Sequence, residues 1–120
     1  SSIIITSKLL KFTNKNIILK IFHIGSSSSY DGFPNTTYYC AAKHALVGAI
    51  KSMNKETIKN NTINYLVSMG SMKTKMGKKV RYQNFNKFLQ TDKVSEFIVN
   101  LAFLDINGYT EEVLIKRFIK

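Results

Sequence analysis

The chain has 120 residues and a formal net charge of +11, with 44% hydrophobic, 12% aromatic and 21% charged residues. This length allows one domain, and the apolar content excludes a disordered segment, because disordered chains lack the residues needed to form a core. Charged residues interrupt every apolar stretch before it reaches the roughly 20 residues of a membrane span. The single cysteine, Cys40, cannot form an internal disulfide, so we expect a cytoplasmic protein in a reducing compartment.

The positive charge comes from 16 lysines and only 2 arginines. Proteins that bind nucleic acids more often use arginine, because its planar group makes paired contacts to bases and phosphates. The one dense basic run, residues 73–81, carries none of the aromatic side chains on which RNA bases stack. The composition therefore disfavours a basic nucleic-acid-binding domain, although it leaves that function open as an alternative.

The first half of the chain predicts a short helix, a strand and a long helix. Residues 1–12 carry apolar side chains at helical spacing, and residues 17–24 form a nearly continuous branched run of strand length. Such a run is typical of a strand that is buried on both faces. Residues 36–60 repeat apolar side chains at helical spacing, which predicts the long helix.

The second half continues the alternation of strands and helices. The pattern predicts a strand over residues 62–68, a helix over residues 92–104 and a last strand over residues 113–118. Strands that alternate with helices of this length indicate a parallel sheet with helical crossovers. The predicted fold class is therefore α/β.

Three side chains with acid–base chemistry follow the first predicted strand. Ser26 stands at the carboxyl end of that strand, where open α/β sheets bind their ligands. Tyr39 follows thirteen residues later, and Lys43 lies one helical turn beyond Tyr39. A cation beside a phenol favours the phenolate form and suits the phenol to proton transfer. A serine hydroxyl at the strand end can hold a carbonyl oxygen within reach of that phenol.

These residues strongly resemble the short-chain dehydrogenase/reductase family of classical type. Ile24-Gly25-Ser26 stands where that family has its catalytic serine, and Tyr39 and Lys43 form its Tyr-x-x-x-Lys motif. The helix that continues through Ala45-Leu46-Val47-Gly48 also looks like the family's helix.

The predicted second strand extends the resemblance. Residues 63–74 are similar to the family's strand that ends in Pro-Gly and has a threonine four residues after the glycine. Gly70 and Thr74 match this pattern, whereas Met69 replaces the proline.

The resemblance implies a Rossmann-like doubly wound parallel sheet. It covers only the C-terminal half of a normal family member, and the Gly-rich turn that seats the cofactor pyrophosphate is missing from the sequence. We therefore expect residues 1–120 to be the C-terminal part of a single domain, with the N-terminal cofactor-phosphate half missing and the fragment alone inactive.

The resemblance also implies an NAD(P)-dependent oxidoreductase that interconverts an alcohol and a ketone or aldehyde. Ser26, Tyr39 and Lys43 are its implied catalytic residues. Tyr39, Lys43, Gly70 and Thr74 are implied to contact the cofactor, which is NAD or NADP. The family further implies a small-molecule substrate, no membrane, and dimers or tetramers of the full-length protein.

Residues in the loop after Ser26 are candidates for a substrate pocket. We assign Ser28 and Tyr30 to it, with Phe33 as a further candidate, while packing of the aromatic rings on the helix is the alternative.

Other chemistry is less well supported. Cys40 and His44 are one helical turn apart and can be drawn as a thiol–imidazole pair, but they lack a third orienting group. Two histidines and one cysteine at these spacings predict no metal site. His23, inside the predicted strand, is expected to be a hydrogen-bonded core histidine. The remaining alternative function is a non-catalytic fragment or scaffold that has inherited the fold.

Overall fold

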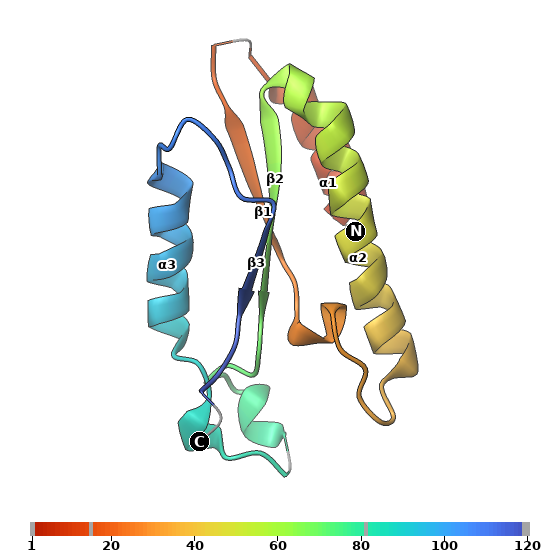
Figure 1. Ribbon diagram of the computed structural model, residues 1–120, viewed down its shortest axis with the longest axis vertical. Helices are drawn as coiled ribbons and strands as arrows, with labels where there is room; N and C mark the ends of the chain where they lie inside the picture. Colours follow the sequence, from red (N-terminus) through yellow and green to blue (C-terminus); the bar gives the residue numbers. More distant parts are fainter. Residues whose placement is uncertain (1, 15, 81, 119–120) are drawn as a thin grey trace.

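The computed structural model describes residues 2–14, 16–80 and 82–118, and it contains a three-stranded parallel sheet between helices (Figure 1). In sheet order the strands are β1 (Leu19–Ile24), β2 (Thr62–Met69) and β3 (Glu112–Ile115). The helices are α1 (Ser2–Leu9), α2 (Thr37–Thr57) and α3 (Thr91–Phe103). Figure 1 shows α1 and α2 on one side of the sheet and α3 on the other. No helix in the described ranges is long and apolar enough to cross a membrane. The predicted α/β class and parallel sheet are confirmed.

Most predicted elements appear within a few residues of their predicted bounds. Short 3-10 turns extend α1 over Leu10–Phe12 and α2 over Ile58–Asn60. Asn61 then takes a left-handed conformation with a φ of 54°, which ends the helical segment directly before β2. The last strand is shorter than predicted, since β3 stops at Ile115, where the ladder with β2 ends.

The strand β1 differs from its prediction because it is not buried on both faces. It pairs with β2 only, so it lies at one edge of the described sheet. Its side chains are mostly half-buried, and Ile24 is 50% exposed. A branched run of strand length therefore predicted the strand correctly, but not the extent of its burial.

The core lies on both faces of β2, because successive side chains of a strand point to opposite faces. Leu66 is fully buried and packs with Ile50 and Met53 of α2. The next residue, Val67, is also fully buried and packs with Val94 on the α3 side. This alternation holds the carboxyl end of β2 between the two helical layers.

A buried polar cluster joins β1, β2 and α2. His23, which is 6% exposed, lies with its Nε2 3.0 Å from Asn64 Oδ1, as expected for a hydrogen-bonded core histidine. Asn54 of α2 makes two bonds to the backbone of Asn64: its Nδ2 donates to the Asn64 carbonyl at 2.9 Å, and its Oδ1 accepts from the Asn64 amide at 2.7 Å. Both asparagines are almost inaccessible to solvent, so these bonds satisfy groups that would be costly to leave unpaired.

Gly25, at the carboxyl end of β1, is required by the close approach of the next strand. Its amide donates to the Val67 carbonyl at 2.9 Å. A Cβ at this position would collide with the Ser68 hydroxyl and lie 3.0 Å from Leu66 Cδ1. We expect Gly25→Ala to lower the free energy of unfolding by about 1–3 kcal/mol, because a packed core yields little to an added carbon.

The matched control for this substitution is Gly48→Ala. Gly48 lies in α2 and faces open space, so the added methyl meets nothing. Alanine there should raise the free energy of unfolding by about 0.5–1 kcal/mol, because glycine is the poorer helix former. Urea denaturation of the two variants gives both values, and destabilisation of equal size in both would contradict the steric account of Gly25.

Candidate active site

A pocket of about 440 Å³ lies at the end of the sheet toward which β2 and β3 point in Figure 1. We call it the strand-end pocket. Its walls come from the loop after β1, the first turns of α2 and the segment after β2. Five of the residues assigned from the sequence line it: Ser26, Ser28, Tyr39, Gly70 and Thr74. This volume is within the range of about 300–1,000 Å³ that small-molecule sites occupy.

Ser26 is held just after the carboxyl end of β1 by a short capped turn. Its Oγ accepts a hydrogen bond from the Ser28 amide at 3.2 Å, and its own amide donates to Ser29 Oγ at 3.4 Å. This reciprocal pair is a capping box that begins the 3-10 turn Ser27–Ser29. Within the described residues nothing accepts the Ser26 hydroxyl proton, so that proton can be donated into the pocket.

Tyr39 and Lys43 lie one turn apart near the start of α2, as their spacing predicts. The Lys43 Nζ lies 5.7 Å from the centroid of the Tyr39 ring, within the distance of a cation–π contact. Tyr39 is 51% exposed and lines the strand-end pocket. Lys43 does not line the pocket, and it contacts the Tyr39 ring there. The arrangement places a positive charge beside a phenol that is accessible from the pocket.

Gly70 and Thr74 lie in the segment that follows β2. The Gly70 amide donates to the Ile115 carbonyl at 3.1 Å, which ties the start of the segment to β3. Thr74 Oγ1 accepts from the Gly77 amide at 2.9 Å, at the start of the 3-10 turn Gly77–Lys79. The segment therefore has a fixed course across the pocket.

Ser28 and Tyr30, both assigned to the substrate pocket, separate in the structure. Ser28 lines the strand-end pocket, and so does Phe33. Tyr30 does not line it. Its hydroxyl instead donates to Glu112 Oε2 at 2.9 Å, and the same carboxylate pairs with Lys51 at 2.6 Å. No local pattern indicates this contact, because Glu112 lies on a strand 82 residues further along the chain.

The contact with Glu112 predicts a pH dependence of stability. Burial, followed by the hydrogen bond to Glu112, raises the pKa of Tyr30 above its ordinary value near 10. The folded state then binds more protons than the unfolded state above pH 10, so Tyr30 stabilises the fold below that pH and its contribution is lost as the pH rises. We expect Tyr30→Phe to lose stability less steeply above pH 10 than the unsubstituted chain.

The check is a series of urea denaturations from neutral pH to above pH 10. Tyr38→Phe is the matched control, because Tyr38 is 93% exposed and has no such partner among the described residues. Identical alkaline slopes for Tyr30→Phe and the unsubstituted chain would contradict the assignment.

The sequence did not indicate the apolar wall of the strand-end pocket. Met69, Met72, Met76 and Val80 form much of it, and they come from a segment with no regular spacing. In the structure, the solvent exposure of these apolar side chains marks the wall: Met76 is 79% exposed and Val80 is 40% exposed. Apolar side chains left in contact with solvent around a pocket are typical of a ligand site.

The thiol–imidazole pair does not form. The Cys40 Sγ lies 3.1 Å from Thr36 Oγ1, and His44 Nδ1 lies 2.9 Å from the backbone carbonyl of Cys40 rather than from its sulfur. Cys40 is buried at 9% exposure, which is typical of a small packed residue.

The comparisons with known proteins agree with the fold. The family model described as short chain dehydrogenase matches residues 1–84. The chain therefore belongs to the short-chain dehydrogenase family. A search of curated proteins finds no match.

Solved structures of oxidoreductases share the fold. A β-ketoacyl-[ACP] reductase from Bacteroides thetaiotaomicron is 21% identical with a TM-score of 0.73, and the match covers 94% of this chain and 46% of that one. A 4-hydroxyisoleucine dehydrogenase complexed with NADH is 24% identical with a TM-score of 0.72, covering 96% and 51%. An alcohol dehydrogenase from the archaeon Thermococcus sibiricus, complexed with 5-hydroxy-NADP, is 18% identical with a TM-score of 0.71, covering 93% and 45%. The chain spans about half the length of these structures, and its fold is that of an oxidoreductase family.

Proposed function

We propose that the complete gene product is an NAD(P)-dependent oxidoreductase that interconverts an alcohol and a ketone or aldehyde. One observation carries the proposal: Ser26, Tyr39, Gly70 and Thr74 line a single pocket, and Lys43 lies over the Tyr39 ring. These residues come from three separate segments of the chain. Only the fold brings them together.

The residues of the strand-end pocket fit the nicotinamide end of the cofactor. The Ser26 hydroxyl has a proton to donate, the Tyr39 phenol adds a further donor, and the Lys43 ammonium lies over the Tyr39 ring. Met69 and Met72 line the same pocket and provide apolar surface for a flat ring. Two solved structures of similar fold contain NADH or 5-hydroxy-NADP, so the proposal leaves the choice between the two cofactors open.

Ser26, Tyr39 and Lys43 would orient the substrate and transfer the proton. When bound, the nicotinamide cofactor supplies or accepts the hydride. The Ser26 hydroxyl donates a hydrogen bond to the carbonyl oxygen of the substrate and holds it near Tyr39. In the direction of reduction, the Tyr39 hydroxyl donates its proton to that oxygen, and the Lys43 charge stabilises the phenolate that remains.

We further propose that residues 1–120 are the C-terminal part of a single domain. The solved structures are about twice as long as the part of them that this chain matches. The chain also lacks the Gly-rich turn on which family members bind the cofactor pyrophosphate. The 120 residues alone are therefore expected to bind the whole cofactor weakly and to be inactive.

Transfer of deuterium tests the proposed reaction directly. The complete gene product is incubated with reduced NAD or NADP deuterated at the transferable position and with a mixture of small ketones and aldehydes. Mass spectrometry should find deuterium on the carbon that carries the new hydroxyl group of at least one product. A protein that binds the cofactor but yields no labelled alcohol from any of these carbonyl compounds would contradict the proposal.

A further inference from the structure

A second pocket, of about 700 Å³, lies on the other side of the segment that follows β2. We call it the basic pocket, and its lining includes Lys73, Lys87, Phe88, Lys93, Arg117 and Phe118. Neighbouring residues of the segment face the two pockets in turn: Lys73 lines the basic pocket, whereas Met72 and Thr74 line the strand-end pocket. The two pockets therefore share this segment as a wall.

Two backbone contacts build this wall. The Lys73 amide donates to the Leu89 carbonyl at 2.9 Å, and the Leu89 amide donates to the Ser71 carbonyl at 3.0 Å. These bonds bring the segment after β2 beside the start of α3. Arg117 follows β3 and lies against Gly70, with its Cγ 3.5 Å from where a Cβ would stand. Lysines and an arginine from distant parts of the sequence thus converge on one hollow.

The basic pocket is lined by several positively charged side chains. None of the described residues that line it is acidic. Lys93 pairs with Glu96 at 2.9 Å. Both side chains are more than half exposed, so this ion pair is weak and neutralises little of the positive charge around the pocket. No carboxylate among the described residues pairs with Lys73 or Arg117. Cations that converge around a cavity attract an anion strongly.

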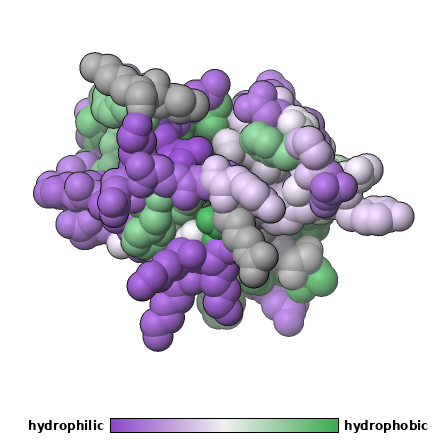
Figure 2. Space-filling view, turned by 90° about the horizontal axis from the view of Figure 1, so that it is seen from below, coloured by the Kyte–Doolittle hydropathy of each residue, from purple (hydrophilic) through white to green (hydrophobic). Residues whose placement is uncertain are grey.

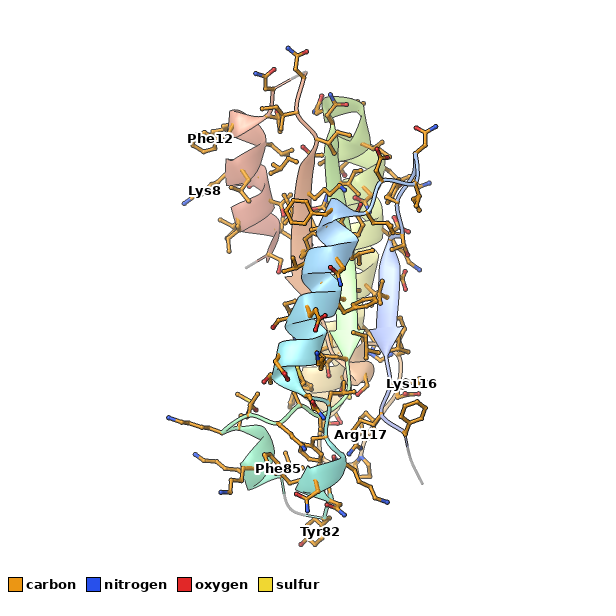
Figure 3. All side chains as sticks on the ribbon, turned by 90° about the vertical axis from the view of Figure 1, so that its left-hand side faces the viewer. Lys8, Phe12, Tyr82, Phe85, Lys116 and Arg117 are labelled. Atoms are coloured by element: carbon orange, nitrogen blue, oxygen red, sulfur yellow. The ribbon has the colours of Figure 1, made fainter. Side chains whose placement is uncertain are left out.

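Arg117 is held against an aromatic ring that also lines the basic pocket. Its guanidinium carbon lies 5.1 Å from the centroid of the Phe88 ring, in cation–π contact. Phe88 is only 4% exposed and is held by Phe85, with the ring centroids 5.4 Å apart. This contact restricts the position of the guanidinium group, whose fork of N–H donors is suited to bond two oxygens of one group. Figure 3 shows Arg117 lying on the side of the molecule that carries Phe85.

The same pocket has an apolar rim. Phe118 lines it and is 90% exposed, although a phenyl ring would normally be expected to lose contact with water. Figure 2 looks onto this end of the molecule and shows hydrophilic side chains around smaller apolar areas. A ligand that satisfies both features carries a compact negative group and an apolar body.

We propose that the basic pocket binds a phosphate monoester. The phosphate lies between Lys73 and Arg117, since a dianion with three oxygens matches one fork-shaped donor and one point charge. The apolar body of the ester packs on Phe118. This site is separate from the proposed active site, so its test does not depend on catalysis.

NMR titration of the complete gene product with phenyl phosphate, at constant ionic strength, tests the site. We expect saturable shifts of the amides of Lys73, Leu89 and Arg117. We also expect binding weaker by at least about tenfold in the Lys73→Gln/Arg117→Gln variant, which loses two charged contacts. Lys73→Gln alone should also weaken binding, and it keeps the contact between Arg117 and Phe88 if the double variant unfolds.

Lys55→Gln/Lys59→Gln is the matched control, because it removes the same charge from exposed positions near the end of α2. Its affinity should stay within about twofold of the unsubstituted chain. Shifts spread over all lysine-bearing surfaces, or equal weakening in both double variants, would overturn the site. Inorganic phosphate that binds as tightly as phenyl phosphate would overturn the ester assignment and assign the site to free phosphate.

Discussion

The Tyr39→Phe variant of the complete gene product should lose about 10³-fold in kcat, within the range that a positioned general acid–base contributes. Phenylalanine keeps the ring that Lys43 contacts and removes only the hydroxyl that would transfer the proton. The cofactor affinity should change by less than about threefold, because the ring and the rest of the strand-end pocket stay in place. Steady-state kinetics and a cofactor titration of the same preparation give both quantities.

Tyr38→Phe is the control for this experiment. Tyr38 is the neighbouring residue on α2, it is 93% exposed, and it does not line the strand-end pocket. Its kcat should equal that of the unsubstituted protein. A Tyr39→Phe variant that keeps most of its activity would remove Tyr39 from the role of acid.

Asn54→Leu should lower the free energy of unfolding by about 3 kcal/mol, because each buried polar group left unpaired costs about 1–3 kcal/mol. The Asn54 side chain makes the hydrogen bonds to the Asn64 backbone that a neighbouring strand would otherwise make. At Asn64 the strand β3 has not yet begun, since its pairing with β2 starts at Leu66. The backbone amide and carbonyl of Asn64 therefore bond the Asn54 amide instead. Leucine has a similar size but no hydrogen-bonding group.

Lys55→Leu provides the comparison, since it adds a leucine at the next, exposed position of α2. The free energy of unfolding of Lys55→Leu should lie within about 0.5 kcal/mol of that of the unsubstituted chain. Urea denaturation measures both variants. If Asn54→Leu unfolds at the same urea concentration as Lys55→Leu, the asparagine does not support the sheet in the way described.

Local sequence patterns predicted the part of the fold and of the site that depends on short-range spacing. The helical repeat placed Tyr39 and Lys43 one turn apart, and the structure has them so. The branched run predicted β1, and the glycine and serines after it predicted that the strand would end there. Hydrophobic periodicity and turn residues carry this information within a few residues.

Long-range contacts were not predictable in the same way. Tyr30 follows Ser26 closely in sequence, but its hydroxyl turns to Glu112, so it does not line the strand-end pocket. The role of Asn54 depends on where β3 begins, and no local pattern around Asn54 encodes that position. The limited burial of β1 depends on which strands lie beside it, whereas its composition reports only strand propensity.

The most direct measurement is a crystal structure of the complete gene product with NAD or NADP. The nicotinamide ring should lie in the strand-end pocket, beside the Tyr39 hydroxyl and between Ser26 and Gly70, with Lys43 near the adjoining ribose. A nicotinamide ring bound elsewhere, with the Tyr39 hydroxyl out of its reach, would contradict the assignment of this pocket as the active site.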